Sequence, residues 1–85
     1  MEGILFADGF EEAFVGVSRR FGIYEPVATY DYDKCIRILM ERDGMHHADA
    51  IEFFEFNVIG SWVGERTPTF LHSVSMKQIE EYTSD

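Results

Sequence analysis

The single cysteine is the feature that most constrains how this chain of 85 residues can fold. Cys35 has no second cysteine to pair with, so an internal disulfide is impossible and a reducing compartment is expected. At this length, one domain spanning residues 1–85 with one hydrophobic core is expected. Because so small a domain buries only about 60–65% of its unfolded surface, large side chains must supply much of the core. Eight Phe, four Tyr and one Trp are present for that role.

Acidic residues outnumber basic residues by 16 to 7, which gives a formal net charge of −9. Such a surface repels phosphate groups, so direct binding to nucleic acid or to an anionic membrane is disfavoured. No apolar stretch approaches the ~18 residues of a membrane span, and the N-terminus lacks the basic flank of a signal peptide. We therefore expect a cytoplasmic protein whose charge either attracts a basic partner protein or serves solubility alone.

The first third of the chain is predicted to form an antiparallel β-hairpin. Residues 13–18 and 27–32 are rich in β-branched and aromatic side chains, and the segment between them holds Gly22 and Pro26 as turn and breaker residues. Residues 4–6 could add a short strand, and residues 69–74 are predicted to join the hairpin as a further strand.

A first helix is predicted to open near Asp33. Either Asp31 or Asp33 can serve as its N-cap, and Gly44 suits the left-handed position that ends a helix, with Met45 making the hydrophobic contact beyond it. The apolar side of this helix holds Cys35, Ile36, Leu39 and Met40. This helix is expected to pack against the core.

A second helix is predicted over residues 47–59, ending at Gly60. Its core side holds Ala50, Ile51, Phe54 and Val58. Another flank carries Asp49, Glu52 and Glu55, and Phe53 and Phe56 project beside these carboxylates. Aromatic residues outside the core side indicate either a helix covered on two sides or a helix that offers anchors to a partner.

These elements together predict a small α+β domain. Three strands in the order ββααβ would form an antiparallel sheet packed against a helix pair. A short terminal helical turn is expected over residues 76–82.

Catalytic and metal-binding groups are weakly supported by the sequence. Cys35 lies on the apolar side of its helix, where a free cysteine behaves as a small hydrophobic residue. His46, His47, Asp49 and His72 are the only candidate metal ligands, and their spacing matches no common site. Pairs of carboxylates, such as Glu11 with Glu12 or Glu80 with Glu81, are typical of a solvated surface. We expect no enzyme, no metal and no cofactor.

Several segments resemble a group of small acidic proteins encoded in bacteriophage and prophage genomes. They are residues 30–36, 38–40, 42–45, 50–58, 62–65 and 67–68, and the likeness covers most of the chain, from about Glu11 to Phe70. In similar sequences position 46 is often Ser or Thr, which indicates that His46 serves the helix start. The group has no established activity, so the resemblance implies a setting inside an infected bacterium. Small acidic phage proteins often act by stoichiometric binding to host machinery, including anti-CRISPR and anti-restriction inhibitors.

The expected function is therefore a non-enzymatic, phage-encoded protein that inhibits or redirects a host protein with a basic surface, such as a nucleic-acid-binding protein. Asp49, Glu52 and Glu55 would orient this partner, and Phe53, Phe56 and Trp62 would anchor it. Two copies of the chain could pair through the same residues. A more specific form of this hypothesis is that the carboxylates mimic nucleic acid, but the even spread of charge along the chain disfavours it. The alternative is a module for a small ligand or nucleotide, in monomeric or dimeric form, with Trp62 and Arg66 of the loop at residues 60–68 lining the pocket.

Overall fold

A three-stranded sheet and three α-helices make up the computed structural model, which describes residues 3–20, 23–62, 64 and 66–83. The strands are β1 (Phe14–Arg20), β2 (Ile23–Asp31) and β3 (Thr69–Leu71), and the α-helices are α1 (Tyr32–Asp43), α2 (His47–Phe53) and α3 (Met76–Thr83). A short 3-10 helix, η1 (Glu11–Ala13), precedes β1, and α2 continues into η2 (Phe54–Val58) and η3 (Ile59–Ser61). The α+β class is confirmed. The terminal helix is present as α3.

The sheet is mixed, which corrects the prediction of an all-antiparallel sheet. β1 and β2 form the expected antiparallel hairpin, with Phe14 opposite Tyr30, whereas β3 runs parallel to β2, with Phe70 opposite Tyr30. The reason lies in the connection between β2 and β3. Two helices carry the chain back to the end of the sheet where β2 began, so β3 must enter in the same direction.

Strand boundaries also differ from the prediction: β1 extends to Arg20, β2 begins at Ile23, and Tyr32, predicted in the second strand, lies in α1. Residues 4–6 form no strand, and the third strand ends at Leu71 instead of extending to residue 74. Pro26 lies within β2 and not in a turn. It is tolerated there because the pairing of β1 with β2 is irregular between Ser18 and Arg20, and β3 pairs only with residues 29–31. The predicted turn residue Gly22 lies outside the described residues.

Helix α1 follows the local signals of the sequence closely. The Asp31 carboxylate caps its N-terminus by accepting a hydrogen bond from the Lys34 backbone N–H at 3.0 Å. Gly44 ends it in the left-handed conformation, with φ of 69°, as predicted. The Met45 N–H then donates to the Leu39 carbonyl at 3.4 Å. The buried residues of the helix are Cys35, Ile36 and Leu39, as the apolar pattern indicated.

The second helical segment is longer and less regular than predicted. After α2 the chain forms a π-helical turn over η2 and a 3-10 turn over η3, so Gly60 lies inside the segment and does not end it. A Cβ atom at Gly60 would approach the Glu55 carbonyl oxygen to 3.0 Å, and glycine therefore allows this tight turn. At the end of η3, the Ser61 hydroxyl donates a hydrogen bond to the Val58 carbonyl at 2.8 Å.

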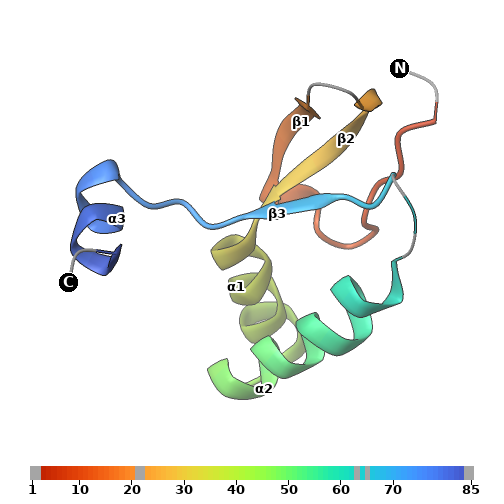
Figure 1. Cartoon of the computed structure of the whole chain (residues 1–85). Helices are drawn as coiled ribbons and strands as arrows, with labels where there is room; N and C mark the ends of the chain where they lie inside the picture. The colour runs from red at the N-terminus through yellow and green to blue at the C-terminus, as the bar shows by residue number, and fades with distance from the viewer. Residues whose placement is uncertain (1–2, 21–22, 63, 65, 84–85) are drawn as a thin grey trace.

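Aromatic rings connect the sheet to the helices. Phe54, fully buried, contacts Phe10, Tyr32 and Phe70 edge to face, with ring centroids 5.1–5.5 Å apart. The Tyr30 ring contacts Phe70 in the same manner. The buried hydrophobic core consists of Ala7, Phe10, Ala13, Ala28, Tyr30, Cys35, Ile36, Leu39, Ala50 and Phe54. Figure 1 shows α1 and α2 next to each other at one end of the sheet, and this core lies where they meet it.

The segment before β1 is tied to the core although it has no strand. The Ala7 N–H donates to the buried Tyr30 hydroxyl at 2.8 Å. The Arg42 guanidinium donates to the Gly9 carbonyl at 2.7 Å and lies 5.6 Å from the centre of the Phe10 ring. These contacts hold residues 7–10 against the core.

Helix α3 stands apart from the rest of the molecule, at the end of an extended segment (Figure 1). Residues 73–80 are all exposed, including the apolar side chains of Val74, Met76 and Ile79. The Ser75 hydroxyl and the Gln78 side chain exchange hydrogen bonds with each other's backbone N–H groups and so form a capping box at the start of the helix.

Candidate partner-binding face

Five of the six predicted partner-binding residues lie on one exposed side of α2 and η2. They are Asp49, Glu52, Phe53, Glu55 and Phe56, all exposed, and we call them the acidic aromatic face. The opposite side of the same segment holds Ala50 and Phe54, both fully buried. The spacing of apolar residues thus correctly separated the core side from the outer side.

Phe56 is the most exposed aromatic residue of this face. Its side chain is 75% exposed, whereas Phe54, two residues earlier, is 0% exposed. Both lie in the π-helical turn, which holds one more residue per hydrogen-bonded turn than an α-helix and changes the directions in which its side chains project. Phe53 is 38% exposed. The segment is thus anchored by Phe54 while Phe56 remains open to solvent.

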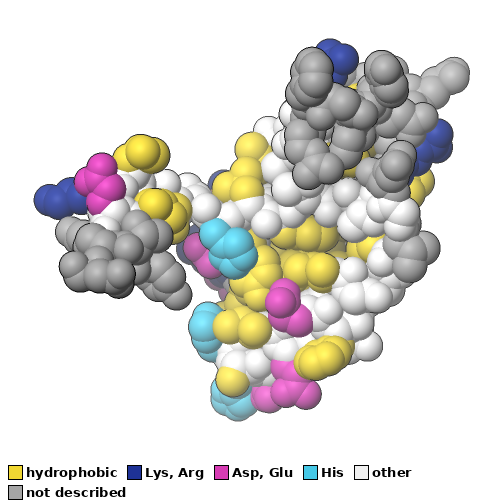
Figure 2. Space-filling view, in the orientation of Figure 1, with side chains coloured by type: hydrophobic (Ala, Val, Ile, Leu, Met, Phe, Trp, Pro, Cys, Tyr) yellow, Lys and Arg dark blue, Asp and Glu magenta, His cyan; other side chains and the backbone are white. Residues whose placement is uncertain are grey.

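The electrostatic character of the face is uniformly negative. No Lys or Arg occurs between Asp43 and Glu65, and Figure 2 shows acidic, apolar and histidine side chains, with no Lys or Arg, around the lower end of the molecule in that view. Glu55 also contacts Tyr32: the Tyr32 hydroxyl donates a long hydrogen bond of 3.4 Å to the Glu55 carboxylate. Burial, followed by the charge of Glu55, raises the pKa of Tyr32.

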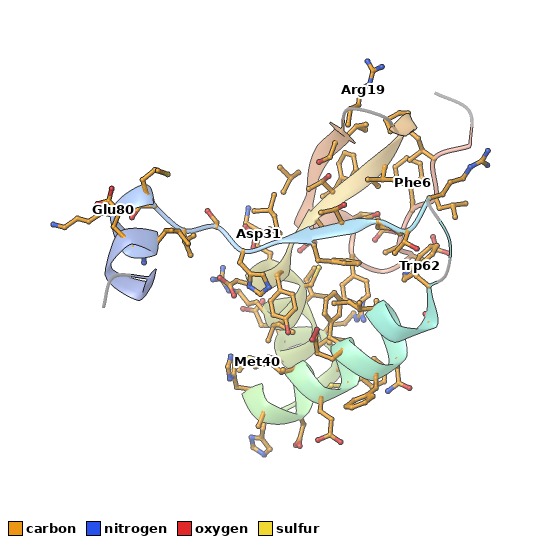
Figure 3. The ribbon with its side chains drawn as sticks, viewed as in Figure 1. Phe6, Arg19, Asp31, Met40, Trp62 and Glu80 are labelled. Atoms are coloured by element: carbon orange, nitrogen blue, oxygen red, sulfur yellow. The ribbon has the colours of Figure 1, made fainter. Side chains whose placement is uncertain are left out.

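Trp62 does not join the acidic aromatic face. It follows η3 and is half-buried against the core, with its backbone N–H donating to the Ile59 carbonyl at 3.2 Å. Figure 3 shows it beyond the end of the helical segment. Its ring is thus largely engaged within the chain.

In the loop at residues 60–68, the two side chains proposed to line a ligand pocket, Trp62 and Arg66, contact different parts of the chain. Trp62 packs on the core, and the Arg66 guanidinium lies so near Gly3 that a Cβ atom there would be 3.0 Å from Arg66 Nη1. Within the loop, the Thr67 hydroxyl donates to the Gly64 carbonyl at 2.8 Å. Val63 and Glu65 lie outside the described residues.

Cys35 is fully buried, as its position on the apolar side of α1 predicted. Burial, followed by the charge of Asp31, raises the pKa of its thiol to about 12. A thiolate is the reactive form of cysteine, so this environment disfavours nucleophilic chemistry at neutral pH.

Of the candidate metal ligands, His46, His47 and Asp49 lie at the start of α2, and His72 follows β3. Among the described residues, no group of three or more His, Cys, Asp or Glu side chains could hold a metal ion. The His72 ring stacks on Tyr32, with centroids 4.2 Å apart, and His46 occupies the N-cap position of α2 without a side-chain hydrogen bond. His46 therefore marks the helix start but does not stabilise it as Ser or Thr would.

The sequence did not indicate the exposed apolar side chains outside α2 and η2. They lie before and along β1 and around α3: Leu5, Phe6, Phe14, Val15, Val17, Val74, Met76 and Ile79. The β-branched and aromatic composition of β1 predicted a strand, but composition could not show which of its side chains the rest of the fold would leave exposed.

Above pH 9, we expect the free energy of unfolding to fall because of Cys35. An ordinary thiol ionises near 9 whereas the buried one ionises near 12, so between these values the unfolded state releases a proton that the folded state retains. Urea unfolding of wild type and Cys35→Ala between pH 7 and about 11 measures this. The wild type should lose stability more steeply than the variant. Equal slopes would contradict the buried, neutral thiol.

No family model matches this chain, and neither do any curated protein or any solved structure. None of the described helices is long and apolar enough to cross a membrane.

Proposed function

We propose that this chain is a non-enzymatic binding protein that docks on a basic surface of another protein through the acidic aromatic face. The observation that carries the proposal is the 75% exposure of Phe56 among Asp49, Glu52 and Glu55. An aromatic side chain held on a packed helix loses little conformational entropy on binding and is a common source of binding energy at interfaces.

The surrounding carboxylates make a basic partner the best match for this face. Long-range attraction between opposite charges speeds association and orients the partners before contact, while like charges disfavour acidic proteins. The net charge of −9 adds to this effect. A face with this pattern therefore combines steering by charge with anchoring by Phe53 and Phe56.

The resemblance to phage-encoded proteins supports a bacterial host protein as the partner and inhibition of a defence system as the outcome. Defence proteins that handle nucleic acid present basic surfaces, which suit the chemistry of the acidic aromatic face. The proposed action is stoichiometric binding inside the bacterial cytoplasm.

Salt should slow association with this partner. Between ~0.05 and ~0.5 M salt the Debye length shrinks about threefold, so steering by Asp49, Glu52 and Glu55 weakens, whereas dissociation changes less. The partner would be captured from bacterial lysate with the immobilised chain, purified, and its kinetics measured by biolayer interferometry. An association rate that does not depend on salt would reject the electrostatic role.

Matched variants test the location of the binding face. Phe56→Ala should weaken the affinity for the captured partner by about tenfold or more, as expected for an aromatic anchor that becomes buried in the complex. Met76→Ala is the control, because Met76 is similarly exposed but lies on α3. Equal effects of the two substitutions, or an effect of Met76→Ala alone, would place binding elsewhere.

A further inference from the structure

A shallow hollow lies between the N-terminal segment and the sheet, and none of its residues belongs to the acidic aromatic face. It has a volume of about 240 Å³ and is lined by Phe6, Ala7, Glu11, Phe14 and Tyr30. This is smaller than the ~300–1,000 Å³ of typical pockets for drug-sized ligands. The hollow therefore fits one side chain better than a nucleotide.

Three aromatic rings bound the hollow from different directions. The Phe6 and Phe14 centroids are 5.9 Å apart with their planes at 54°, and the Phe14 and Tyr30 centroids are 5.6 Å apart with their planes at 87°. Phe6 is 55% and Phe14 42% exposed, so these rings keep apolar surface in contact with water. Figure 3 shows Phe6 between the N-terminal segment and the sheet. Rings turned against each other in this way can surround a small group rather than stack on it.

A carboxylate completes the lining. Glu11 Oε1 accepts a hydrogen bond from the Gly9 N–H at 3.2 Å. Hydrogen bonds from the Glu11 and Gly9 backbone lower the pKa of this carboxyl, so it is ionised at neutral pH. The nearby Arg42 guanidinium is directed to the Gly9 carbonyl and the Asp43 carboxylate instead. Glu11 therefore keeps accepting capacity for a further cation.

We propose that this hollow binds an arginine side chain of a basic partner protein. The aliphatic stem lies against Phe6 and Phe14, and the guanidinium meets the ring faces and the Glu11 carboxylate. A flat guanidinium suits both contacts, since it stacks on aromatic rings and pairs with carboxylates in a forked geometry. The inference rests on the proposed function in taking the arginine from a basic partner, but the site can be tested without that partner.

The test is a titration of the full chain with Nα-acetyl-arginine amide, followed by chemical shifts of the backbone N–H groups. We expect saturable shifts centred on Phe6, Glu11 and Phe14. The uncharged isostere Nα-acetyl-citrulline amide should bind at least about threefold more weakly, because it lacks the cation. Glu11→Gln should weaken arginine binding by a similar factor, and Glu12→Gln, the matched control on an exposed neighbour, should not.

Each other outcome would overturn the proposal. Equal shifts with the citrulline and arginine compounds would show that the hollow does not recognise the positive charge. Equal arginine binding by Glu11→Gln and the wild type would show that the Glu11 carboxylate takes no part in binding. Shifts centred on α2 would mean that arginine binds the acidic aromatic face. If arginine fails to bind while Phe56→Ala still weakens the captured partner, the hollow is rejected and the proposed function stands.

Discussion

Phe54→Ala is expected to lower the free energy of unfolding by about 3–5 kcal/mol, whereas Phe56→Ala should change it by less than about 1 kcal/mol. Phe54 is fully buried among Phe10, Tyr32 and Phe70, so its truncation leaves a cavity at the centre of the core. Phe56 is 75% exposed and leaves none. Because a domain of this size has only about 5–15 kcal/mol of total stability, Phe54→Ala should remove a large part of it.

Urea denaturation followed by circular dichroism measures both variants. The two substitutions remove the same side chain from the same π-helical turn, so each serves as the control of the other. If Phe56→Ala destabilises the isolated chain as much as Phe54→Ala, then Phe56 packs within the fold in solution and cannot be the anchor of a partner-binding face.

Tyr30→Ala should also lower the free energy of unfolding by about 3–5 kcal/mol. Unlike Phe54→Ala, it removes a hydrogen bond as well as a buried ring. The Tyr30 ring is 1% exposed and contacts Phe14 and Phe70, while its hydroxyl accepts the Ala7 N–H. Tyr30→Phe keeps the ring and removes only the acceptor, so a loss of about 1–3 kcal/mol is expected from the Ala7 N–H left without its partner.

Hydrogen exchange separates the two roles of Tyr30. In Tyr30→Phe the Ala7 amide should exchange faster, while amides of α1 keep protection close to that of the wild type after correction for global stability. Unchanged exchange at Ala7 would show that the hydroxyl does not hold the N-terminal segment on the core.

Local signals in the sequence were enough to predict α1 and the hairpin. Helix α1 begins at a capping Asp31 and ends at a left-handed Gly44, and both devices act through atoms within a few residues. The apolar spacing in α2 and η2 likewise placed Ala50 and Phe54 inside and the five residues of the acidic aromatic face outside. Helix periodicity depends on backbone geometry alone, so such assignments need no knowledge of the partners across the core.

Other features depend on contacts between distant parts of the chain, and only the tertiary structure decided them. The direction of β3 follows from the path of the connecting helices, and the Tyr30 and Arg42 contacts fix Ala7 and Gly9 against distant parts of the chain. The sequence predicted Trp62 as an anchor for a partner, and only the tertiary structure shows that its side chain is half-buried against the core after η3. The hollow between Phe6, Glu11 and Phe14 has no signature in the sequence, since its side chains meet only when the N-terminal segment packs against the sheet.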